Sequence, residues 1–474
     1  MKALLIVFAL GCGLACHAQD ASPAAGPNQP NLVFIFIDDL GFADLSCTGN
    51  TQVKTPVIDR LAAEGTLFKQ FYVASPICSP SRVGVTTGQY PARHLINSFL
   101  NMRKRNRERG MRDFLDPKAP CIARAFQEAG YATAHYGKWH MGGGRDVGDA
   151  PLPTEYGFDD SLVCFEGLGP RVLFGRAGLR SHSAKLGRGP IQFAPKHKLS
   201  RMYVDKSISF LKKNKEKPVY LHLWLNDVHD AHNPAPGEQV KYAEATENAF
   251  EQKFFAVLVE MDRQIGRLVE AVKAEGQEER TILVLTGDNG PTAWKRQYYD
   301  KGIDPPGDTG PYRGRKWSLY EGGIRQPLIV KWPGKVPAGR VDEDTILAAV
   351  DFFPTFTSLA GVKAPEVEFD GIDAKEAYLG RPLERKKAIF WEYGRDPSYL
   401  KPGLENDQSP NLAMRNGKWK CLINADGTDL QLYDFSKAQD EEKNVAQESP
   451  EVAEKMSKQL LDWRKSLPGL EDQP

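Results

Sequence analysis

Short, unbroken runs of apolar residues recur along this chain, and amphipathic segments separate them. A short apolar run bounded by turn residues is typical of a strand that is buried on both faces of a parallel sheet. The runs that predict strands are Asn31–Ile37, Tyr131–Tyr136, Pro218–Leu225, Thr281–Leu285, Pro327–Trp332 and Ala388–Trp391.

Helical patterns lie between these strands. Thr55 and Pro56 predict a helix start, with threonine as the N-cap and proline in the first turn, and this helix should reach Glu64. Pro120–Ala129 also has helical spacing, and Ala249–Ala274 predicts a long amphipathic helix. Strands that alternate with helices indicate an α/β fold, in which helices cover both faces of a mostly parallel sheet.

The pattern changes near Arg385. Beyond it, Asn-Gly and Asp-Gly turns separate short strand-like segments, which favours an antiparallel meander. A last helix is expected from about Pro450 to Lys465. We therefore expect a main domain over residues 31–384 and a small C-terminal subdomain, an antiparallel sheet plus a helix, over residues 385–474.

The N-terminus has the pattern of an export signal. Ala3–Ala15 is apolar but short for a membrane span, and the small residue Ala18 allows cleavage after it. Residues 1–18 are therefore predicted to be a signal peptide, and residues 19–30, rich in proline and alanine, a flexible linker. We expect an exported protein, secreted or periplasmic; a lipid anchor on Cys16 is the alternative. No later apolar run approaches transmembrane length.

The overall charge excludes partners that a global electric field would attract. The 474 residues include 62 lysines and arginines against 61 aspartates and glutamates, which gives a formal net charge of +1. Nucleic acid and membrane surfaces are therefore not expected partners, and any attraction for an anionic substrate has to be local.

Polar side chains follow two of the predicted strands. Asp38 and Asp39 come directly after the first strand, and Asp288 and Asn289 follow the strand that ends at Leu285. Ligand sites in open α/β sheets lie at the carboxyl ends of strands, so these side chains should meet. Their oxygen atoms suit a hard cation such as Ca²⁺ better than zinc. Either motif alone would also be explained as a turn.

A compact motif surrounds Cys78. Residues 78–82 (Cys-Ser-Pro-Ser-Arg), followed by residues 87–94 (Thr-Gly-Gln-Tyr-Pro-Ala-Arg-His), resemble the signature of the formylglycine-dependent sulfatases, also called type I sulfatases. In that family a maturating enzyme oxidises the cysteine to an aldehyde. The resemblance implies that Cys78 is the precursor of the nucleophile and that Arg82 supports it with its charge. The alternative is a structural cysteine in a turn before a helix.

The number of cysteines is compatible with this modification. Two of the seven cysteines would leave with the signal peptide, and an odd number would remain, so at least one is unpaired in an oxidising compartment. Conversion of one thiol to an aldehyde would remove the leftover, although five free cysteines would fit too. The remaining cysteines are Cys47, Cys78, Cys121, Cys164 and Cys421.

The same resemblance assigns a fold and a metal site. It implies an alkaline-phosphatase-like fold, in which the mostly parallel sheet is sandwiched by helices. It also implies one Ca²⁺ ion, bound by Asp38, Asp39, Asp288 and Asn289 together with the modified Cys78.

Three basic motifs complete the resemblance, at residues 137–140, 226–229 and 314–323. We expect the lysine and histidine of the first motif to share one side of an extended segment, because side chains in a strand alternate. The third motif resembles arylsulfatase B-like enzymes, which indicates an N-acetylgalactosamine or similar glycan sulfate. By position the family gives sulfate-contacting or catalytic roles to Lys138, His140, His229 and Lys316.

The function implied by the resemblance is hydrolysis of sulfate esters of a carbohydrate by a calcium-assisted formylglycine nucleophile, in a catalytic sulfatase domain over residues 31–384. It also implies a formylglycine-generating or sulfatase-maturating enzyme as a partner. One alternative is a formylglycine-dependent phosphonate monoester or phosphodiester hydrolase. Another is a non-catalytic glycan-binding relative in which Cys78 is never oxidised.

Some segments leave two interpretations open. In the segment 229–232 an alanine stands where the family often has proline, so the role of its second histidine is not defined. The basic run Arg103–Arg109 is either a solvated face or a contact for a polymer with several sulfates. Four aromatic residues fit either ordinary packing or flat faces for a sugar ring: Trp294, Tyr298, Tyr299 and Tyr312.

Overall fold

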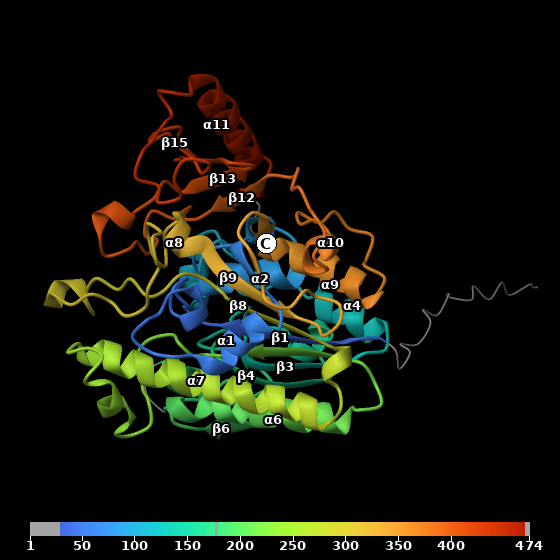
Figure 1. Cartoon of the computed structure of the whole chain (residues 1–474). Coiled ribbons are helices and arrows are strands. Elements are labelled where there is room, and N and C mark those ends of the chain that lie inside the picture. Colours follow the sequence, from blue (N-terminus) through green and yellow to red (C-terminus); the bar gives the residue numbers. More distant parts are fainter. Residues whose placement is uncertain (1–28, 176–178, 470–474) are drawn as a thin grey trace, which may run out of the picture.

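One large sheet runs through the centre of the molecule (Figure 1). The computed structural model describes residues 29–175 and 179–469, so the predicted signal peptide and nearly all of the predicted linker lie outside the described residues. The strands of this sheet are β1 (Asn31–Ile37), β2 (Thr66–Tyr72), β3 (Ala132–Lys138), β4 (Asp160–Cys164), β5 (Arg171–Leu173), β6 (Ile191–Phe193), β7 (Val219–Trp224), β8 (Thr281–Gly287), β9 (Arg325–Lys331), β10 (Arg340–Asp342) and β11 (Leu347–Ala348).

The sheet is mostly parallel, as predicted. Its order is β10-β2-β9-β8-β1-β7-β3-β4-β5-β6, and β11 pairs with β2. Among the described strands of this large sheet, only β9 runs against its neighbours, β2 and β8. The strand β1 lies between β8 and β7 and is parallel to both, so the segments after these three strands emerge at the same edge.

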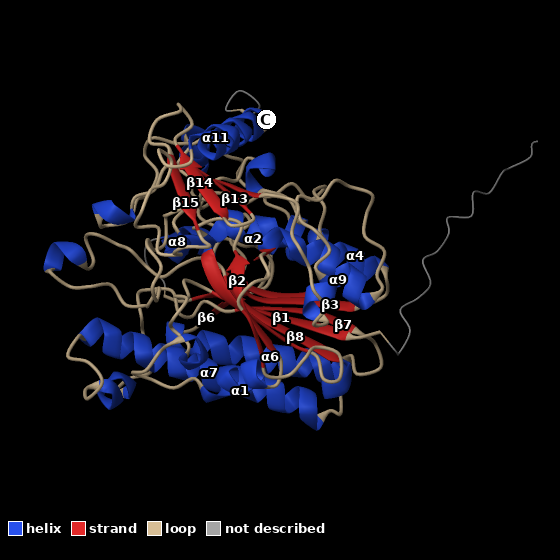
Figure 2. Cartoon of the chain, turned by 45° about the horizontal axis from the view of Figure 1, so that its top comes forward, coloured by secondary structure: helices blue, strands red, loops and turns tan. Residues whose placement is uncertain are grey.

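Helices cover both faces of the sheet, with α1, α6 and α7 on one side and α2, α4 and α9 on the other (Figure 2). The helices are α1 (Pro56–Ala63), α2 (Cys78–Thr87), α3 (Arg103–Glu108), α4 (Ile122–Glu128), α5 (Leu179–Ala184), α6 (Leu199–Lys213), α7 (Ala249–Ala274), α8 (Glu321–Ile324), α9 (Phe352–Ala360), α10 (Lys375–Tyr378) and α11 (Pro450–Lys465).

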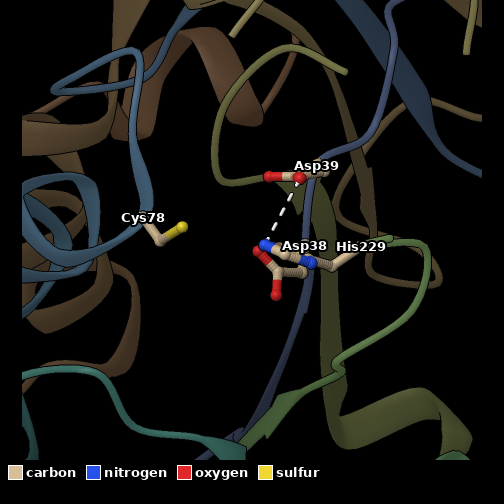
Figure 3. Close-up of side chains that lie close together, drawn as sticks. All are labelled: Asp38, Asp39, Cys78 and His229. Atoms are coloured by element: carbon tan, nitrogen blue, oxygen red, sulfur yellow. Dashed lines mark ion pairs between the residues drawn. The ribbon is translucent and has the colours of Figure 1, made fainter. Parts of the chain in front are cut away.

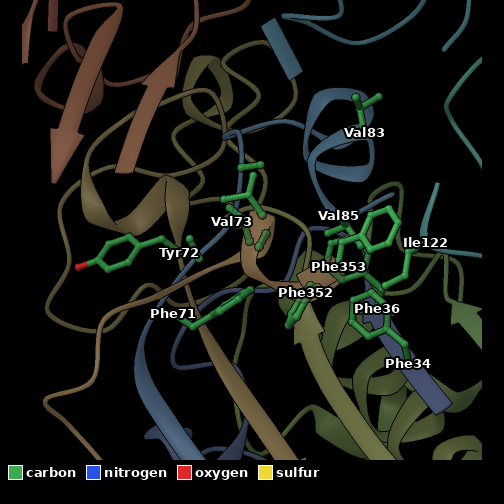
Figure 4. Packing of buried hydrophobic residues seen from close by; sticks show 14 of the residues in the cluster. Phe34, Phe36, Phe71, Tyr72, Val73, Val83, Val85, Ile122, Phe352 and Phe353 are labelled. Carbon is green, nitrogen blue, oxygen red and sulfur yellow. The ribbon is translucent and has the colours of Figure 1, made fainter. Parts of the chain in front are cut away.

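The apolar run of β1 explains why this strand is central. Its side chains alternate between two cores, with Phe34 and Phe36 in the core beneath α2 and α9 and Val33 and Ile35 in the core beneath α7. Figure 4 shows the first of these cores, where the ring of Phe34 lies 5.0 Å from that of Phe352. Since both faces are covered, a strand at this place has to be apolar throughout.

A second, smaller sheet packs above α2 and α8, together with α11 (Figure 1). Its four strands are antiparallel, as the Asn-Gly and Asp-Gly turns predicted. They are β12 (Ile389–Glu392), β13 (Leu412–Asn416), β14 (Trp419–Ile423) and β15 (Gln431–Asp434). The residue at which the two units separate, near 385, stays a prediction.

A buried ionic cluster joins this smaller sheet to the main unit. The ammonium of Lys420 in β14 lies 2.8 Å from a carboxylate oxygen of Glu321 in α8 and 2.7 Å from one of Glu441. Glu441 also accepts a hydrogen bond from the backbone N–H of Glu321 at 2.6 Å. Arg325 lies 3.2 Å from Glu321 on its other side. The three side chains that bridge the two units are fully buried, so their charges are shielded from water.

The sequence predictions hold for the elements that have a strong pattern. All six predicted strands and the predicted helices are present, with ends that differ by a few residues. Several elements were not predicted, among them strand β2 and helices α6 and α9. The five cysteines of the described residues form no disulfide with one another. None of the described helices combines the length and the apolar character that a membrane span needs.

Candidate active site

The carboxyl ends of β1 and β8 bring four oxygen-bearing side chains together. These strands are parallel neighbours, with Ile37 beside Gly287, so the residues after them meet. The backbone N–H of Asp39 donates to Asp288 at 3.0 Å, and the amide of Asn289 donates to Asp39 at 2.8 Å. All four side chains, those of Asp38, Asp39, Asp288 and Asn289, are buried.

Helix α2 begins at Cys78 and presents this residue to the carboxylates. One ligand atom from each of Asp38, Asp39, Cys78 and His229 lies within 4.8 Å of the others, and Figure 3 shows the sulfur pointing toward this group. Burial raises the pKa of the Cys78 thiol to about 11, since the charges of two nearby lysines offset it only in part. The positive end of the α2 dipole faces the same point, which favours an anion there.

Arg82 lies one turn along α2 and is rigidly held. Its guanidinium donates to Asp288 at 2.6 Å and to the backbone carbonyl of Lys138 at 3.2 Å. Its carbon Cζ lies 5.2 Å from the ring of Trp224 and 5.4 Å from that of Phe36. Two hydrogen bonds and two aromatic faces fix a fully buried cation beside the nucleophile position.

Two lysines approach the carboxylates from separate segments. Lys138 ends β3, and its ammonium donates to both oxygens of Asp38, at 2.9 and 2.6 Å. Lys316 donates to Asp39. Burial alone would lower the pKa of Lys316, but the charge of Asp39 outweighs it and holds this pKa well above its ordinary value. Both ammonium groups are therefore charged although they are buried.

A glycine lets β3 reach this position. Gly137 has a φ of 127°, and a Cβ at this residue would lie 1.7 Å from the carbonyl oxygen of Trp224 in β7. No other residue type fits this approach without moving one of the strands. The Gly-Lys pair of the 137–140 motif is thereby explained by packing as well as by chemistry.

His229 faces the same carboxylates from the turn after β7. Its Nδ1 donates to the carbonyl of Asp230, which leaves Nε2 directed toward Asp39, 3.6 Å from a carboxylate oxygen. Burial lowers the pKa of His229, although the charge of Asp39 opposes this effect. A ring held by Nδ1 can exchange a proton with a ligand only through Nε2.

His140 lies at the end of the β3 segment, but the segment is not extended there. The prediction of a shared side on an extended strand is wrong, because His140 has a φ of 51° and its backbone turns away from β3. The centroid of its ring still lies 4.8 Å from that of Phe165. The ammonium of Lys138 lies 5.2 Å from the centroid of the Phe165 ring. Burial and the charges of Lys138 and Arg82 hold the pKa of His140 well below its ordinary value, so the ring is neutral.

The donor set fits a hard cation. Three carboxylates and one amide supply oxygen atoms only, and among the described residues one oxygen each of Asp39 and Asn289 is buried without a hydrogen bond. Burial, together with the charge of Asp38, raises the pKa of Asp288 to about 7, as expected where carboxylates crowd together. A cation such as Ca²⁺ would satisfy the free oxygens and relieve this repulsion.

A small cavity opens onto this group. Its volume is about 150 Å³, and it extends from Asp38, Lys138 and His229 toward the segments that flank them. The wall also includes Asn226 of the 226–229 motif, and its residues that the sequence did not single out are Phe165, Phe174, Lys196 and Asn233. Lys196 precedes α6 and Asn233 follows the His229 turn, so no local pattern marked either one.

The basic run is divided by the fold. Arg109 is buried, with its guanidinium 3.1 Å from Asp396 and 4.5 Å from the ring of Phe99. Arg103 pairs with Asp113 at 2.7 Å. The side chains between Arg103 and Arg109 are mostly exposed. The run is therefore not one continuous cationic surface.

The four aromatic residues mostly contact protein. Tyr298 is fully buried and donates to Asp230 at 3.2 Å, and the ring of Tyr312 lies 4.8 Å from that of Phe42. Trp294 packs against Trp317 at 4.6 Å and is 37% exposed. Packing accounts for Tyr298 and Tyr312, and Trp294 keeps an accessible face.

Comparisons with known proteins agree with this geometry. The family model described as Sulfatase matches residues 30–362, and the one described as N-sulphoglucosamine sulphohydrolase, C-terminal, matches residues 307–466. The chain is 28% identical to N-acetylgalactosamine-6-O-sulfatase of Bacteroides thetaiotaomicron, over 91% of this chain and 92% of that protein. It is 31% identical to steryl-sulfatase of Mus musculus, over 82% of this chain and 72% of that protein.

Solved structures resemble the fold over nearly all of its length. The structure of Ps i-CgsB in complex with k-i-k-neocarrahexaose has a TM-score of 0.74 and 26% identity, with 92% of both chains covered. The phosphonate monoester hydrolase of Agrobacterium radiobacter has a TM-score of 0.62 and 21% identity, with 92% of this chain and 96% of that chain covered, which shows a common fold alone.

Proposed function

The chain belongs to the sulfatase family and is a sulfuric ester hydrolase, and on that premise we propose that it hydrolyses sulfate esters of a carbohydrate through a formylglycine formed from Cys78, with one bound Ca²⁺ ion. The observation that carries this proposal is the convergence of Cys78, at the start of α2, with buried carboxylates and buried cations. A cysteine held in this way is unsuited to being a thiolate, because burial raises its pKa.

Three buried cations can neutralise the negative charge of the sulfate ester, which is the main obstacle to the reaction. A sulfate ester has negative charge on its peripheral oxygens, and that charge repels an oxygen nucleophile unless it is neutralised. Arg82, Lys138 and Lys316 approach from three elements and are each less than 5% exposed. Their charges act at short range in a site that excludes most water, so they stabilise the transition state without reorganising.

A formylglycine and a Ca²⁺ ion, which the structure does not contain, would add to these cations in the active site. A formylglycine at position 78 supplies, when hydrated, one hydroxyl that can attack sulfur and a second whose deprotonation can release the sulfate. Asp38, Asp39, Asp288 and Asn289 would hold Ca²⁺, which supplies further positive charge for the sulfate oxygens.

Two histidines suit the proton transfers. The charge of Asp39 favours the protonated imidazolium of His229, and this form can protonate the leaving alcohol oxygen through Nε2, with Lys316 nearby on the shared carboxylate Asp39. His140 is neutral because of its lowered pKa, so it can accept the proton of the second hydroxyl. Asp288 would assist the attacking hydroxyl, and its position beside Arg82 in the same cluster supports this role.

A carbohydrate substrate is supported by the relatives. The bacterial relative with 28% identity is named for N-acetylgalactosamine-6-O-sulfate hydrolysis, and a solved neighbour with 26% identity holds an oligosaccharide. The Gly314–Gly323 stretch points to the same group of sugars. We therefore propose a sulfated glycan, with N-acetylgalactosamine or a similar hexose as the first candidate, and an exported site of action.

Mass spectrometry of the tryptic peptide Gln70–Arg82 tests the nucleophile. Protein produced in a host with a maturating enzyme should give a peptide lighter by the exchange of a thiol for an aldehyde oxygen, and that peptide should react with a hydrazide. Cys78→Ala serves as the control and should release no sulfate from any sulfated sugar. An unmodified cysteine from a competent host would refute the proposed mechanism and favour a glycan-binding role.

Parallel kinetics test the class of ester. We expect kcat/KM for 4-nitrophenyl sulfate or a sulfated sugar to exceed that for an aryl phosphodiester or a phosphonate monoester. The reverse order would replace the sulfatase assignment by a phosphorus ester hydrolase with the same nucleophile.

A further inference from the structure

Lys196 has no part in the roles assigned above, although it lies at the wall of the active-site cavity. It is the first residue of the short helical turn Lys196–Lys198, which leads directly into α6. Its ammonium donates to the backbone carbonyl of His229 and to that of Ala231, the latter at 2.9 Å. One cation therefore holds two carbonyls on either side of Asp230.

These two carbonyls have no other hydrogen-bond donor among the residues that the structure describes. The segment that contains them is held elsewhere by several bonds. The backbone N–H of Val228 donates to Asp38 at 2.8 Å, and that of His229 donates to Asn226 at 3.1 Å. Lys196 thus donates hydrogen bonds to the two carbonyls of the turn that these backbone bonds do not involve.

The turn sets the direction of the imidazole. Nδ1 of His229 donates to the carbonyl of Asp230, the residue between the two that Lys196 binds. The carboxylate of Asp230 accepts hydrogen bonds from Thr292 at 2.9 Å and from Tyr298 at 3.2 Å. If the carbonyls at 229 and 231 moved, the plane of the peptide between them would rotate, and the ring bound to it would follow.

We propose that Lys196 is a positioning residue for proton transfer: it fixes the turn so that Nε2 of His229 points at the leaving oxygen of the substrate. This inference rests on the proposed function, in which His229 protonates that oxygen. Asp227 and Asp230 lie close enough to Lys196 to balance its charge. The segment before α6 is thereby part of the active site through its effect on His229.

Leaving-group dependence distinguishes this role from a purely structural one. A sugar alkoxide is a poor leaving group and needs a proton, whereas 4-nitrophenolate leaves without one. Lys196→Met should therefore lower kcat/KM for a sulfated sugar that the wild type hydrolyses by about 100-fold, the effect of a misdirected catalytic group. For 4-nitrophenyl sulfate the same variant should lose less than about threefold.

Two further variants make the result interpretable. Lys196→Arg keeps the charge and the donors and should recover much of the activity on the sugar sulfate. Lys198→Met changes an exposed lysine two residues along the same turn and should leave both substrates unaffected. If Lys196→Met folds poorly, the two substrates are compared on the folded fraction of that variant, because a ratio within one variant is independent of the amount folded.

His229→Ala separates failure of the inference from failure of the proposed function. If His229→Ala impairs both substrates equally, or if the wild type releases sulfate from neither, the role proposed for His229 is wrong and this inference falls with it. If His229→Ala is selective for the sugar sulfate but the Lys196 variants lose both activities in the same proportion, or lose neither, the positioning role of Lys196 is overturned.

Discussion

Lys420→Met should destabilise the protein strongly, because it removes the one cation that two buried carboxylates share. Lys420 lies 2.8 Å from Glu321 and 2.7 Å from Glu441, and these side chains are fully buried. Methionine has a similar length and fills the space, so the loss is mainly one of charge. Glu321 keeps Arg325 at 3.2 Å, whereas Glu441 loses its ion-pair partner among the described residues.

The expected cost follows from removing one partner of a buried ion pair. Such a change typically costs about 3–5 kcal/mol, and we take the lower end because Arg325 remains. The entropy of unfolding grows with chain length, so in a protein of this size 1 kcal/mol corresponds to about 1 °C, and a loss of ~3 kcal/mol lowers the melting temperature by roughly 3 °C. Lys418→Met is the matched control, since Lys418 is half exposed and its partner Asp434, 3.0 Å away, keeps two hydrogen bonds from Ser436. It should cost less than about 1 kcal/mol.

The deficit should also depend on pH. Burial and the charge of Glu321 raise the pKa of Glu441 to about 7, above its ordinary value of 4.5, with Lys420 opposing the shift. Loss of Lys420 raises this pKa further. A carboxyl whose pKa is higher in the folded state stabilises the fold at low pH, and that contribution is lost as pH rises through the folded value. The gap in melting temperature between wild type and Lys420→Met should therefore widen from about pH 5 to about pH 8.

Differential scanning fluorimetry at one scan rate measures both effects. A Lys420→Met deficit equal to that of Lys418→Met would show that the buried cluster contributes no more than a surface pair. A gap that is constant or narrows with pH would refute the charge argument, even if the variant were unstable.

Three further predictions concern the active site. Arg82→Lys should lower kcat on any sulfate ester by at least about 100-fold, measured by sulfate release, because lysine cannot replace both hydrogen bonds and the stacking on Trp224. Ca²⁺ should raise the melting temperature of the wild type, and Asn289→Ala should require roughly 10–100-fold more Ca²⁺ for the same shift, in a titration after EDTA treatment. Changing the exposed residues Lys104 and Arg107 together to glutamine should leave kcat/KM on a monosaccharide sulfate within about twofold, since neither side chain is built into the site.

The sequence predicted what depends on local pattern. Asp38 and Asn289 were assigned to one site because each follows a strongly apolar strand, and parallel strands end at a common edge. The position of Cys78 followed from its motif. In these cases a few consecutive residues were enough for the prediction. The pairing of β1 with β8 then brings the separate segments together.

Other features depend on contacts between distant residues, for which a single sequence has no pattern. Lys196 binds the carbonyl of His229 only because the turn before α6 packs against the turn after β7. Lys420 looks like any lysine in a strand, yet Glu321 and Glu441 enclose it. His140 was predicted to be extended because it follows a strand, but it has a φ of 51°, and no residue near it in the sequence indicates this turn.

The depth of Cys78 imposes a sequence of events during biosynthesis. The side chain is only 3% exposed, in the first turn of a helix whose residues are all buried. An enzyme that oxidised this residue would have to bind it in an extended chain, and a molecule that folded first would be closed to it. Oxidised and unoxidised molecules would then share one fold, so a purification that selects folded protein would keep both. The specific activity of a preparation would record how often oxidation preceded folding.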